Sequence, residues 1–452
     1  MIRFSELPIE RLLDPKGYAC DCGLHHVCDL RHFKCGAGVI AQVPRVVRDM
    51  GYTYPFVVCD PNTYEAAGAQ VVKLLEAAGI QYKLFIVPQK GEKVEPDEWS
   101  VGAVTMALDV NCDMFLCVGS GVLNDVCKVS SFAAGKPQMV VITAPSMDGY
   151  ASSSSSMHVN DVKTTLYNHC PVAIIADTDI VANAPMRMLW SGFGDMIAKY
   201  VATCEWRIAH LIVGEYYCEE VASLMRRALK AIVDNADKLS GRDPQVIQAI
   251  TEGLVLAGIA MSYAQVSRPA SGLEHYFSHM WEMIGPERGV TPDFHGIQVG
   301  VGTLQSLKLY DWIRTLKPTR ERGLAHMAAF DRGAWEDMVR DIFGQSAPQI
   351  LAVEEKAKKN DPVQHRKRLD RIVDNWDKIL AIIEEELPET SVIEGIMKEL
   401  GMPMVAADLG WDEKGAKDAY TGSREIRDKY LTSSMLWDIG YAQEARDLVQ
   451  AK

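Results

Sequence analysis

Short apolar runs alternate with longer amphipathic segments over the first ~180 residues of the chain. The runs predict strands at 56–59, 83–87, 114–118, 139–143 and 172–176, and the segments between them predict helices at 63–78, 96–110 and 122–134. Strands that are apolar throughout and separated by helices are typical of βαβ units around a buried parallel sheet. Ligands bind such a sheet at the carboxyl ends of its strands.

No further strand is expected after Pro185, and helical periodicity dominates from Trp190 to the end of the chain. We therefore expect an α/β domain over residues 1–184 and an all-helical domain over residues 185–452. A length of 452 residues exceeds what one ordinary core organises, which agrees with two domains. The serine run Ser152–Ser156 has the composition of a linker, but its place directly after a strand end favours a structural turn.

Composition narrows the classes of protein. A hydrophobic content of 48% with 24% charged residues is typical of a soluble globular protein. The net charge of −13 argues against nucleic acid or an anionic membrane as a partner. We find no run of 18 apolar residues and no signal peptide, so we expect a cytoplasmic protein. The odd total of eleven cysteines agrees with reduced thiols in that compartment.

One dense cluster of cysteines lies near the start of the chain, where Cys20, Cys22, Cys28 and Cys35 are interspersed with histidines. Such a set could bind zinc. The spacing lacks the paired C-x2-C arms that structural zinc sites usually have. We therefore favour thiols without a metal and assign the Cys20–Cys35 segment no role.

Two loops at predicted strand ends carry candidate chemistry. The segment Gly119–Asp125, G-S-G-V-L-N-D, opens directly into a helix, whose N-terminus can hold a phosphate, although a tight turn would need the same glycines. Asp60 follows the first predicted strand and could bind the ribose hydroxyls of an adenosine. Its charge would oppose a 2′-phosphate, which favours NAD over NADP. The second loop, Thr143–Ser152, is rich in hydroxyl groups and contains Asp148.

Three of the eleven histidines lie close together in the sequence, at His275, His279 and His295. His275 and His279 are four residues apart in a predicted helix and so share one face. Neutral imidazoles with a carboxylate can hold a divalent metal, although H-x3-H pairs also occur by accident. Asp195, in the segment G-F-G-D, is a candidate carboxylate, and an aspartate there could equally cap a helix.

Taken in order, G-S-G-V-L-N-D, T-A-P-S-M-D-G-Y-A-S, G-F-G-D, G-L-E-H-x3-H and D-F-H-G resemble the bacterial sn-glycerol-1-phosphate dehydrogenases. These enzymes belong to the superfamily of iron-containing alcohol dehydrogenases, glycerol dehydrogenases and dehydroquinate synthases. The resemblance covers about residues 20 to 310. The longer C-terminal part, beyond residue 310, receives no function from it.

The resemblance implies a dehydroquinate synthase-like fold, in which an α/β NAD(P)-binding domain precedes an all-helical metal domain. It implies metal ligands at Asp195, His275 and His295, with substrate contacts at Asp148 and His279. The implied dinucleotide contacts, with Asp60 added from its strand-end position, are Asp60, Gly119, Ser120, Gly121, Asn124, Asp125, Thr143, Ser146 and Ser152.

The implied reaction interconverts dihydroxyacetone phosphate and sn-glycerol 1-phosphate with NAD(P)H, with NAD favoured and nickel or zinc as the divalent metal. The partner is then a small phosphorylated substrate, and a homodimer or larger homo-oligomer is expected. Lys163 and Lys199 are candidates for binding the phosphate. Three alternatives remain: a glycerol dehydrogenase acting on the unphosphorylated polyol, a dehydroquinate synthase-type lyase, and a catalytically inactive protein that binds the nucleotide or phosphate ester.

Overall fold

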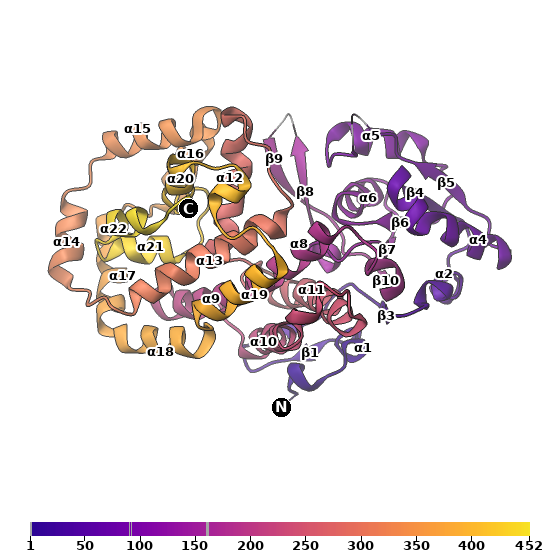
Figure 1. The fold of residues 1–452 in the computed structure, drawn as a ribbon, viewed down its shortest axis with the longest axis horizontal. Helices are drawn as coiled ribbons and strands as arrows, with labels where there is room; N and C mark the ends of the chain where they lie inside the picture. Colours follow the sequence, from indigo (N-terminus) through magenta and orange to yellow (C-terminus); the bar gives the residue numbers. More distant parts are fainter. Residues whose placement is uncertain (1, 90, 92, 160–161) are drawn as a thin grey trace. The chain divides into compact units, whose positions relative to one another are not determined.

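The computed structural model describes residues 2–89, 91, 93–159 and 162–452, and Figure 1 follows the chain in colour from the N-terminus to the C-terminus. Its main sheet has six parallel strands in the order β3-β10-β7-β6-β4-β5. Their bounds are β3 His32–Gly36, β4 Pro55–Cys59, β5 Lys83–Ile86, β6 Met114–Gly119, β7 Gln138–Ile142 and β10 Ala173–Asp177.

The predicted α/β architecture is confirmed. Five of the six strands, all except β3, coincide with the predicted apolar runs. Every residue of β4, β6, β7 and β10 is buried, which explains why these strands are apolar without alternation. The helices of this part are α1 Ile9–Leu12, α2 Val43–Asp49, α3 Pro61–Thr63, α4 Ala69–Ala77, α5 Glu98–Ala107 and α6 Gly121–Ala133, with a π-helical segment at Tyr64–Gly68.

Three strand features were not predicted. The edge strand β3 pairs with β10 but has the polar sequence H-F-K-C-G. A small antiparallel pair, β1 Tyr18–Ala19 and β2 His25–His26, lies in the cysteine-rich segment. A hairpin is formed by β8 Ser154–Val159 and β9 Val162–Tyr167, so the expectation of a turn at Ser152–Ser156 is wrong for Ser154–Ser156. Serines occupy both the buried and the exposed positions of β8, which hides the two-residue period of the strand.

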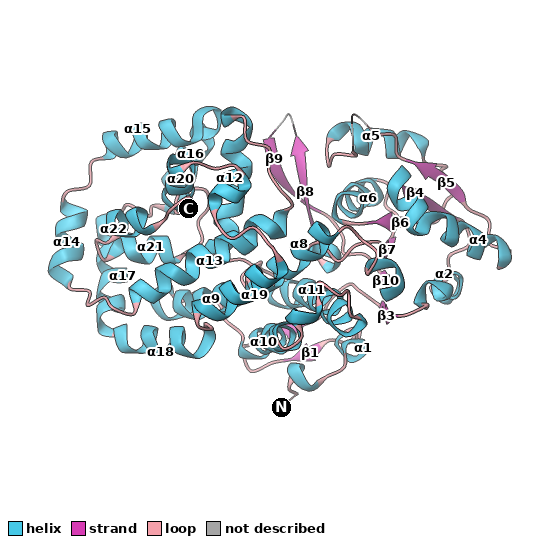
Figure 2. Ribbon diagram, viewed as in Figure 1, coloured by secondary structure: helices cyan, strands magenta, loops and turns pink. Residues whose placement is uncertain are grey.

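After Asp177 the described residues form helices and loops, which Figure 2 shows in cyan and pink. The helices of this part are α7 Thr178–Val181, α8 Met186–Ile197, α9 Lys199–Val213, α10 Glu219–Val233, α11 Pro244–Ala264, α12 Leu273–Arg288, α13 His295–Ile313, α14 Arg320–Ala328, α15 Arg332–Phe343, α16 Ala347–Ala357, α17 Pro362–Asp374, α18 Trp376–Glu386, α19 Thr390–Leu400, α20 Glu413–Ser423, α21 Thr432–Asp438 and α22 Ala442–Leu448. Among the described helices, α11 alone is long and apolar enough to cross a membrane, and 72% of its apolar window is buried within the protein.

The chain forms two compact units. Unit 1 contains Met1–Met196 and Cys218–Ser267, and unit 2 contains Ile197–Tyr217 and Arg268–Lys452. The predicted division at residue 184 separates the strands, the last of which ends at Asp177, from the helices that follow α7. The compact units divide the chain differently, because α10, α11 and nearly all of α8 belong to the same unit as the sheet. The described residues of the second unit form helices joined by turns and loops.

The C-terminal part beyond residue 310 builds much of unit 2. Its helix α20 packs against α12, α19 packs against α13, and α17 and α18 pack against α9. An ion pair joins Arg288 of α12 to Asp418 of α20 at 2.8 Å, and Trp281 stacks on Trp411 with ring centroids 6.5 Å apart. These helices therefore support α12, which carries two of the three candidate histidines.

Candidate functional site

The carboxyl ends of β4, β6 and β7 lie side by side in unit 1, because these strands are neighbours in the sheet. Asp60 follows β4, Gly119 ends β6, and Thr143 follows β7. Thr143 donates its backbone N–H to the Gly119 carbonyl at 3.1 Å. The structure thus brings these three predicted nucleotide positions to one sheet edge, where parallel sheets bind their ligands.

The loop after β6 leads directly into α6, whose N-terminus is the predicted phosphate site. Ser120 is the N-cap of this helix, and its side chain makes no capping bond among the described contacts. The first N–H groups of α6 therefore remain suited to a phosphate. A Cβ atom on Gly121 would lie 3.1 Å from Cγ of Met147, so glycine here lets the loop after β7 approach closely.

Asp60 is also a helix cap. Its Oδ1 accepts a hydrogen bond from the backbone N–H of Thr63 at 2.7 Å, and the Thr63 hydroxyl accepts one from the backbone N–H of Asp60 at 2.9 Å. This capping box fixes the direction of the Asp60 side chain at the strand end. The predicted ribose contact and the cap therefore involve the same carboxylate.

Two predicted nucleotide residues on α6 are held by internal bonds. Asn124 is fully buried, and its Oδ1 accepts from Nε2 of Gln138 at 3.1 Å. Asp125 forms an ion pair with Lys128 at 3.0 Å and accepts the backbone N–H of Ser156 at 2.9 Å. These bonds hold α6 against β7 and β8, so both residues shape the site whether or not they touch a nucleotide.

Lys128 was not singled out from the sequence. It is fully buried, and its Nζ donates to the Gly149 carbonyl at 3.1 Å and to Oγ of the predicted site residue Ser152 at 3.3 Å. The side chain therefore ties α6 to the loop that follows Asp148. Its position three residues after Asp125 on a helix was the available signal.

The loop after β7 packs directly on α8 within unit 1. A Cβ atom on Gly192 would lie 1.9 Å from the Pro145 carbonyl oxygen, so only glycine permits this approach. One residue further along the loop, the carbonyl of Ser146 accepts a hydrogen bond from the Ser191 hydroxyl at 2.7 Å. Nearby, the backbone N–H of Asp148 donates to Oδ2 of Asp195 at 2.9 Å. Gly192, the first glycine of G-F-G-D, thus lets α8 lie close enough to the loop for Asp195 to accept the hydrogen bond from Asp148.

The three candidate histidines converge within unit 2. His275 and His279 lie one turn apart on α12, and His295 is the first residue of α13. The ring centroid of His295 lies 5.4 Å from that of His275 and 5.8 Å from that of His279. His275 is buried, whereas His279 and His295 are partly exposed. The three imidazole rings therefore lie next to one another.

A carboxylate orients each of these histidines. Nδ1 of His275 donates to Oε1 of Glu274 at 2.8 Å. Glu282 bridges the other two, with Oε1 at 3.3 Å from Nδ1 of His295 and Oε2 at 3.5 Å from Nδ1 of His279. Holding Nδ1 in this way leaves the Nε2 lone pairs of His275 and His295 suited to a metal, which is the usual arrangement around a bound ion. Neither glutamate was singled out from the sequence.

Glu205 is a further buried carboxylate, and it lies close to Glu274. Glu205 of α9 accepts the backbone N–H of Leu273 at 3.0 Å and that of Thr432 at 2.9 Å. Burial and the nearby Glu274 raise the pKa of Glu205 to about 7. These bonds fix the N-terminus of α12 and hence the position of His275.

Asp195, the third predicted metal ligand, belongs to unit 1, and the chain passes into unit 2 two residues later at Ile197. The three predicted ligands thus divide between the units, with one in unit 1 and two in unit 2. Within each unit the predicted residues occupy ordered, largely buried positions.

Comparison with known proteins identifies the family of this chain. Residues 34–185 match the family model described as iron-containing alcohol dehydrogenase. The chain is 28% identical over 412 residues to a glycerol-1-phosphate dehydrogenase [NAD(P)+] of Halalkalibacterium halodurans, covering 91% of this chain and 93% of that protein. It is 36% identical over 276 residues to the enzyme of that name from Methanosarcina barkeri, covering 61% of this chain and 75% of that protein.

The fold is shared with solved structures of low sequence identity. A glycerol dehydrogenase from Schizosaccharomyces pombe superposes with a TM-score of 0.60 at 15% identity, covering 92% of this chain and 91% of that one. At this identity the likeness concerns the fold alone. The Methanosarcina barkeri relative is more similar, at 36% identity over 75% of its length, and this similarity shows that the chain belongs to the glycerol-1-phosphate dehydrogenase [NAD(P)+] family.

Proposed function

We propose that this chain is a metal-dependent oxidoreductase that interconverts dihydroxyacetone phosphate and sn-glycerol 1-phosphate with NAD(P)H. The observation that carries the proposal is the 36% identity to a glycerol-1-phosphate dehydrogenase [NAD(P)+], of which this chain covers 75%. The chain also supplies candidate groups for the reaction, namely a helix start suited to a phosphate, the histidines of α12 and α13, and the carboxylate of Asp195.

Asp195, His275 and His295 are the proposed ligands of one divalent metal. The residues fit such an ion because Glu274 holds Nδ1 of His275, and Glu282 faces Nδ1 of His295. One carboxylate and two imidazoles suit several first-row ions, of which we propose nickel or zinc. When bound, the metal supplies Lewis acidity at the ketone oxygen, while NAD(P)H supplies the hydride.

His279 is proposed to hold or move the proton of the substrate hydroxyl. It lies one turn from His275, and its Nδ1 faces Glu282, which favours the tautomer with a lone pair on Nε2. Asp148 is proposed to hold another substrate hydroxyl. Its backbone is fixed by the bond to Asp195, so its side chain starts from a defined position beside a proposed metal ligand.

NAD(P)H is proposed to bind along the carboxyl ends of β4, β6 and β7. The helix start at Ser120 and Gly121 would bind the pyrophosphate, and Asp60 would bind the ribose. Thr143 and Ser146 belong to the loop after β7 and are also proposed to contact the nucleotide. The carboxylate of Asp60 would repel a 2′-phosphate, so we propose that NADH is preferred to NADPH.

The phosphate of the substrate is proposed to bind near the N-terminus of α12, where two lysines meet consecutive carbonyls. Nζ of the fully buried Lys199 donates to the Ala270 carbonyl at 3.2 Å, and Nζ of Lys429 donates to the Ser271 carbonyl at 3.4 Å. Burial, with Arg268 and another arginine nearby, lowers the pKa of Lys429 to about 7. The side chain of Lys163, the other candidate, lies outside the described part of the structure.

The direct test is a spectrophotometric assay of NADH oxidation with dihydroxyacetone phosphate and with dihydroxyacetone. We expect a strong preference for the phosphorylated ketone and a product of the sn-1 configuration. Comparable kcat/KM values for the two ketones would favour a glycerol dehydrogenase. A product that is oxidised by an enzyme strict for sn-glycerol 3-phosphate would also contradict the proposal.

The setting of the enzyme is part of the proposal. We propose a cytoplasmic protein, which is supported by the eleven described cysteines, all of which are present as thiols. We also propose a homodimer or larger homo-oligomer. Light scattering on the purified protein measures its mass directly, and the mass of a single chain would contradict that part of the proposal.

A further inference from the structure

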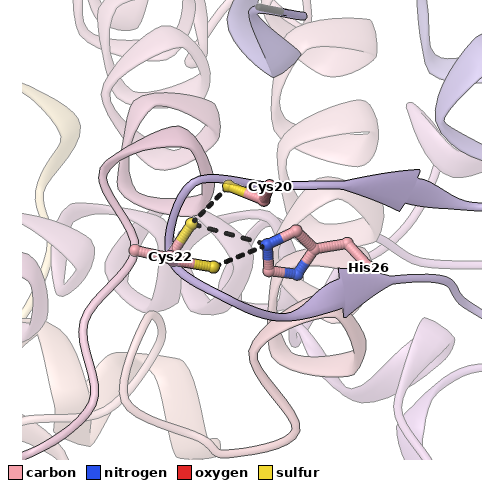
Figure 3. Close-up of side chains that lie close together, drawn as sticks. Cys20, Cys22 and His26 are labelled. Carbon is pink, nitrogen blue, oxygen red and sulfur yellow. Dashed lines mark hydrogen bonds between the residues drawn. The ribbon is translucent and has the colours of Figure 1, made fainter.

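Four metal-binding side chains meet within unit 1, apart from the residues assigned above. Cys20 and Cys22 lie between β1 and β2, His26 lies in β2, and Cys218 is the N-cap of α10. Their donor atoms all lie within 4.8 Å of one another. Figure 3 shows the side chains of Cys20, Cys22 and His26 directed toward one another from the hairpin.

The separations match the edges of a tetrahedral zinc site. Zn–S bonds of about 2.3 Å and Zn–N bonds of about 2.0 Å place two sulfurs about 3.8 Å apart, and a sulfur and a nitrogen about 3.5 Å apart. The Sγ atoms of Cys20 and Cys218 are 3.7 Å apart. Nε2 of His26 lies 3.3 Å from Sγ of Cys22 and 3.6 Å from Sγ of Cys218.

The histidine of this cluster is already oriented as a ligand. Nδ1 of His26 lies 2.8 Å from the carbonyl oxygen of Tyr263, to which it donates a hydrogen bond. The proton therefore belongs on Nδ1, and the Nε2 lone pair points toward the three sulfurs. A backbone carbonyl that fixes the tautomer of a histidine is a frequent companion of zinc ligands.

The surroundings suit a closed, structural site. His26 has 0% and Cys218 has 1% of its surface exposed, and the rings of Phe4 and Tyr263 pack on the imidazole with centroids 5.4 Å away in both cases. Cys218 also lies at the N-terminus of α10, which fixes the position of its side chain. Cys20 and Cys22 are partly exposed, so an ion can reach the site from the side of the hairpin.

We propose that Cys20, Cys22, His26 and Cys218 bind one zinc ion in a closed tetrahedral site that attaches the N-terminal hairpin to α10 and α11. All four coordination positions are filled by the protein, which is typical of structural rather than catalytic zinc. The sequence interpretation favoured thiols without a metal because the segment lacked paired arms. The missing ligand is Cys218, which lies 192 residues after His26.

Cobalt gives a readout that the proposed catalytic site cannot produce. Chelator-treated, reduced full-length protein is titrated with Co²⁺, and thiolate-to-cobalt charge-transfer absorption is recorded. The proposed ligands Asp195, His275 and His295 include no sulfur, so this absorption reports the cysteine cluster alone. We expect its intensity to correspond to one cobalt ion per chain and to disappear when Zn²⁺ in excess of both proposed metal sites displaces the cobalt. Absence of this absorption in the unmutated protein would overturn the proposal.

Variants supply the second arm. In Cys20→Ser/Cys22→Ser two thiolates are removed at partly exposed positions, so we expect Zn²⁺ affinity at this site to fall by at least about 100-fold, since losing one supporting partner already costs about 10–100-fold. Cys35→Ser is the matched control, because Cys35 belongs to the same sequence cluster but lies in β3. Equal Zn²⁺ content in the two variants, or a Cys20–Cys218 disulfide in place of the metal, would overturn the proposal.

Discussion

The backbone N–H of Asp148 donates to Oδ2 of Asp195 at 2.9 Å, which links the loop after β7 to the last turn of α8. This contact depends on Gly192, one turn earlier on α8, because the helix there lies against the Pro145 carbonyl. The loop that carries the proposed substrate contact Asp148 and the proposed metal ligand Asp195 are therefore positioned by one close approach of two backbones.

We predict that Gly192→Ala disrupts this contact. Its Cβ atom would lie 1.9 Å from the Pro145 oxygen, and neither backbone can move without its neighbours. We expect a loss of about 1–3 kcal/mol in the free energy of unfolding, as for an overpacked core, together with reduced activity. Urea denaturation measures the first and the ketone assay the second.

The matched control is Gly102→Ala in α5, where an added Cβ atom meets nothing within 4 Å. Alanine in a helix interior is favoured over glycine by about 0.5–1 kcal/mol, so this variant should be slightly stabilised with unchanged activity. If the two variants behaved alike, close packing at Gly192 would not be the reason for its glycine.

The second prediction concerns the proposed catalytic metal. Glu274→Gln should weaken metal binding by about 10–100-fold, because an uncharged amide oxygen is a weaker acceptor for Nδ1–H of His275 than the carboxylate. His295→Ala should lose the ion, and chelation should abolish activity in the unmutated enzyme. Metal content is measured by mass spectrometry after equilibrium dialysis in a Cys20→Ser/Cys22→Ser background, so that zinc at the cysteine cluster is not counted. Full occupancy of this site in a variant with Asp195, His275 and His295 all replaced by alanine would remove these residues from the argument.

The third prediction separates the two roles of Asp60. Asp60→Ser keeps an oxygen that can cap α3 but removes the charge, whereas Asp60→Ala removes both. We expect the preference for NADH over NADPH to narrow in both variants, while the alanine variant alone loses about 1 kcal/mol of stability. An unchanged ratio of kcat/KM for the two nucleotides in both variants would exclude Asp60 from ribose recognition.

Most of the sheet could be predicted because its strands are buried on both faces and therefore apolar without interruption. The hairpin β8–β9 could not, because serines fill buried and exposed positions alike. The histidine cluster followed from helical spacing on α12. Glu274 and Glu282 were missed because a glutamate beside a histidine resembles an ordinary surface charge until the fold buries it. Cys218 was missed because long-range pairing leaves no periodic signal.

The fourth prediction is a pH dependence of stability in chelator-treated protein. The pKa of Glu205 is raised from 4.5 to about 7, so the folded state binds more protons than the unfolded state between these values. The stability from this group is fully present below pH 4.5 and is lost as the pH rises toward 7. As the pH rises from 5 to 8, we expect the free energy of unfolding of Glu205→Gln to increase by about 2 kcal/mol relative to that of the unmutated protein.

Urea denaturation of both proteins at the two pH values measures this change. The glutamine amide also faces the backbone N–H groups of Leu273 and Thr432, and the free-energy cost of that contact does not depend on pH. We therefore compare how the stability difference between the two proteins changes from pH 5 to pH 8. A gap between the two proteins that stays constant from pH 5 to pH 8 would show that Glu205 is ionised throughout.

The last prediction concerns recognition of the substrate phosphate. Lys199→Met keeps much of the length and the apolar stem of the side chain but removes the buried ammonium group that lies on the Ala270 carbonyl. A site built for a phosphate loses a charge-assisted contact in this variant, whereas a substrate without phosphate never made that contact. We expect kcat/KM for dihydroxyacetone phosphate to fall by about 100-fold or more, and that for dihydroxyacetone to change little. Lys429→Met should show a smaller effect of the same kind, because a pKa of about 7 leaves Lys429 only partly charged at neutral pH. An equal loss for both ketones would mean that Lys199 supports the fold of α9 and α12 and does not select the phosphorylated substrate.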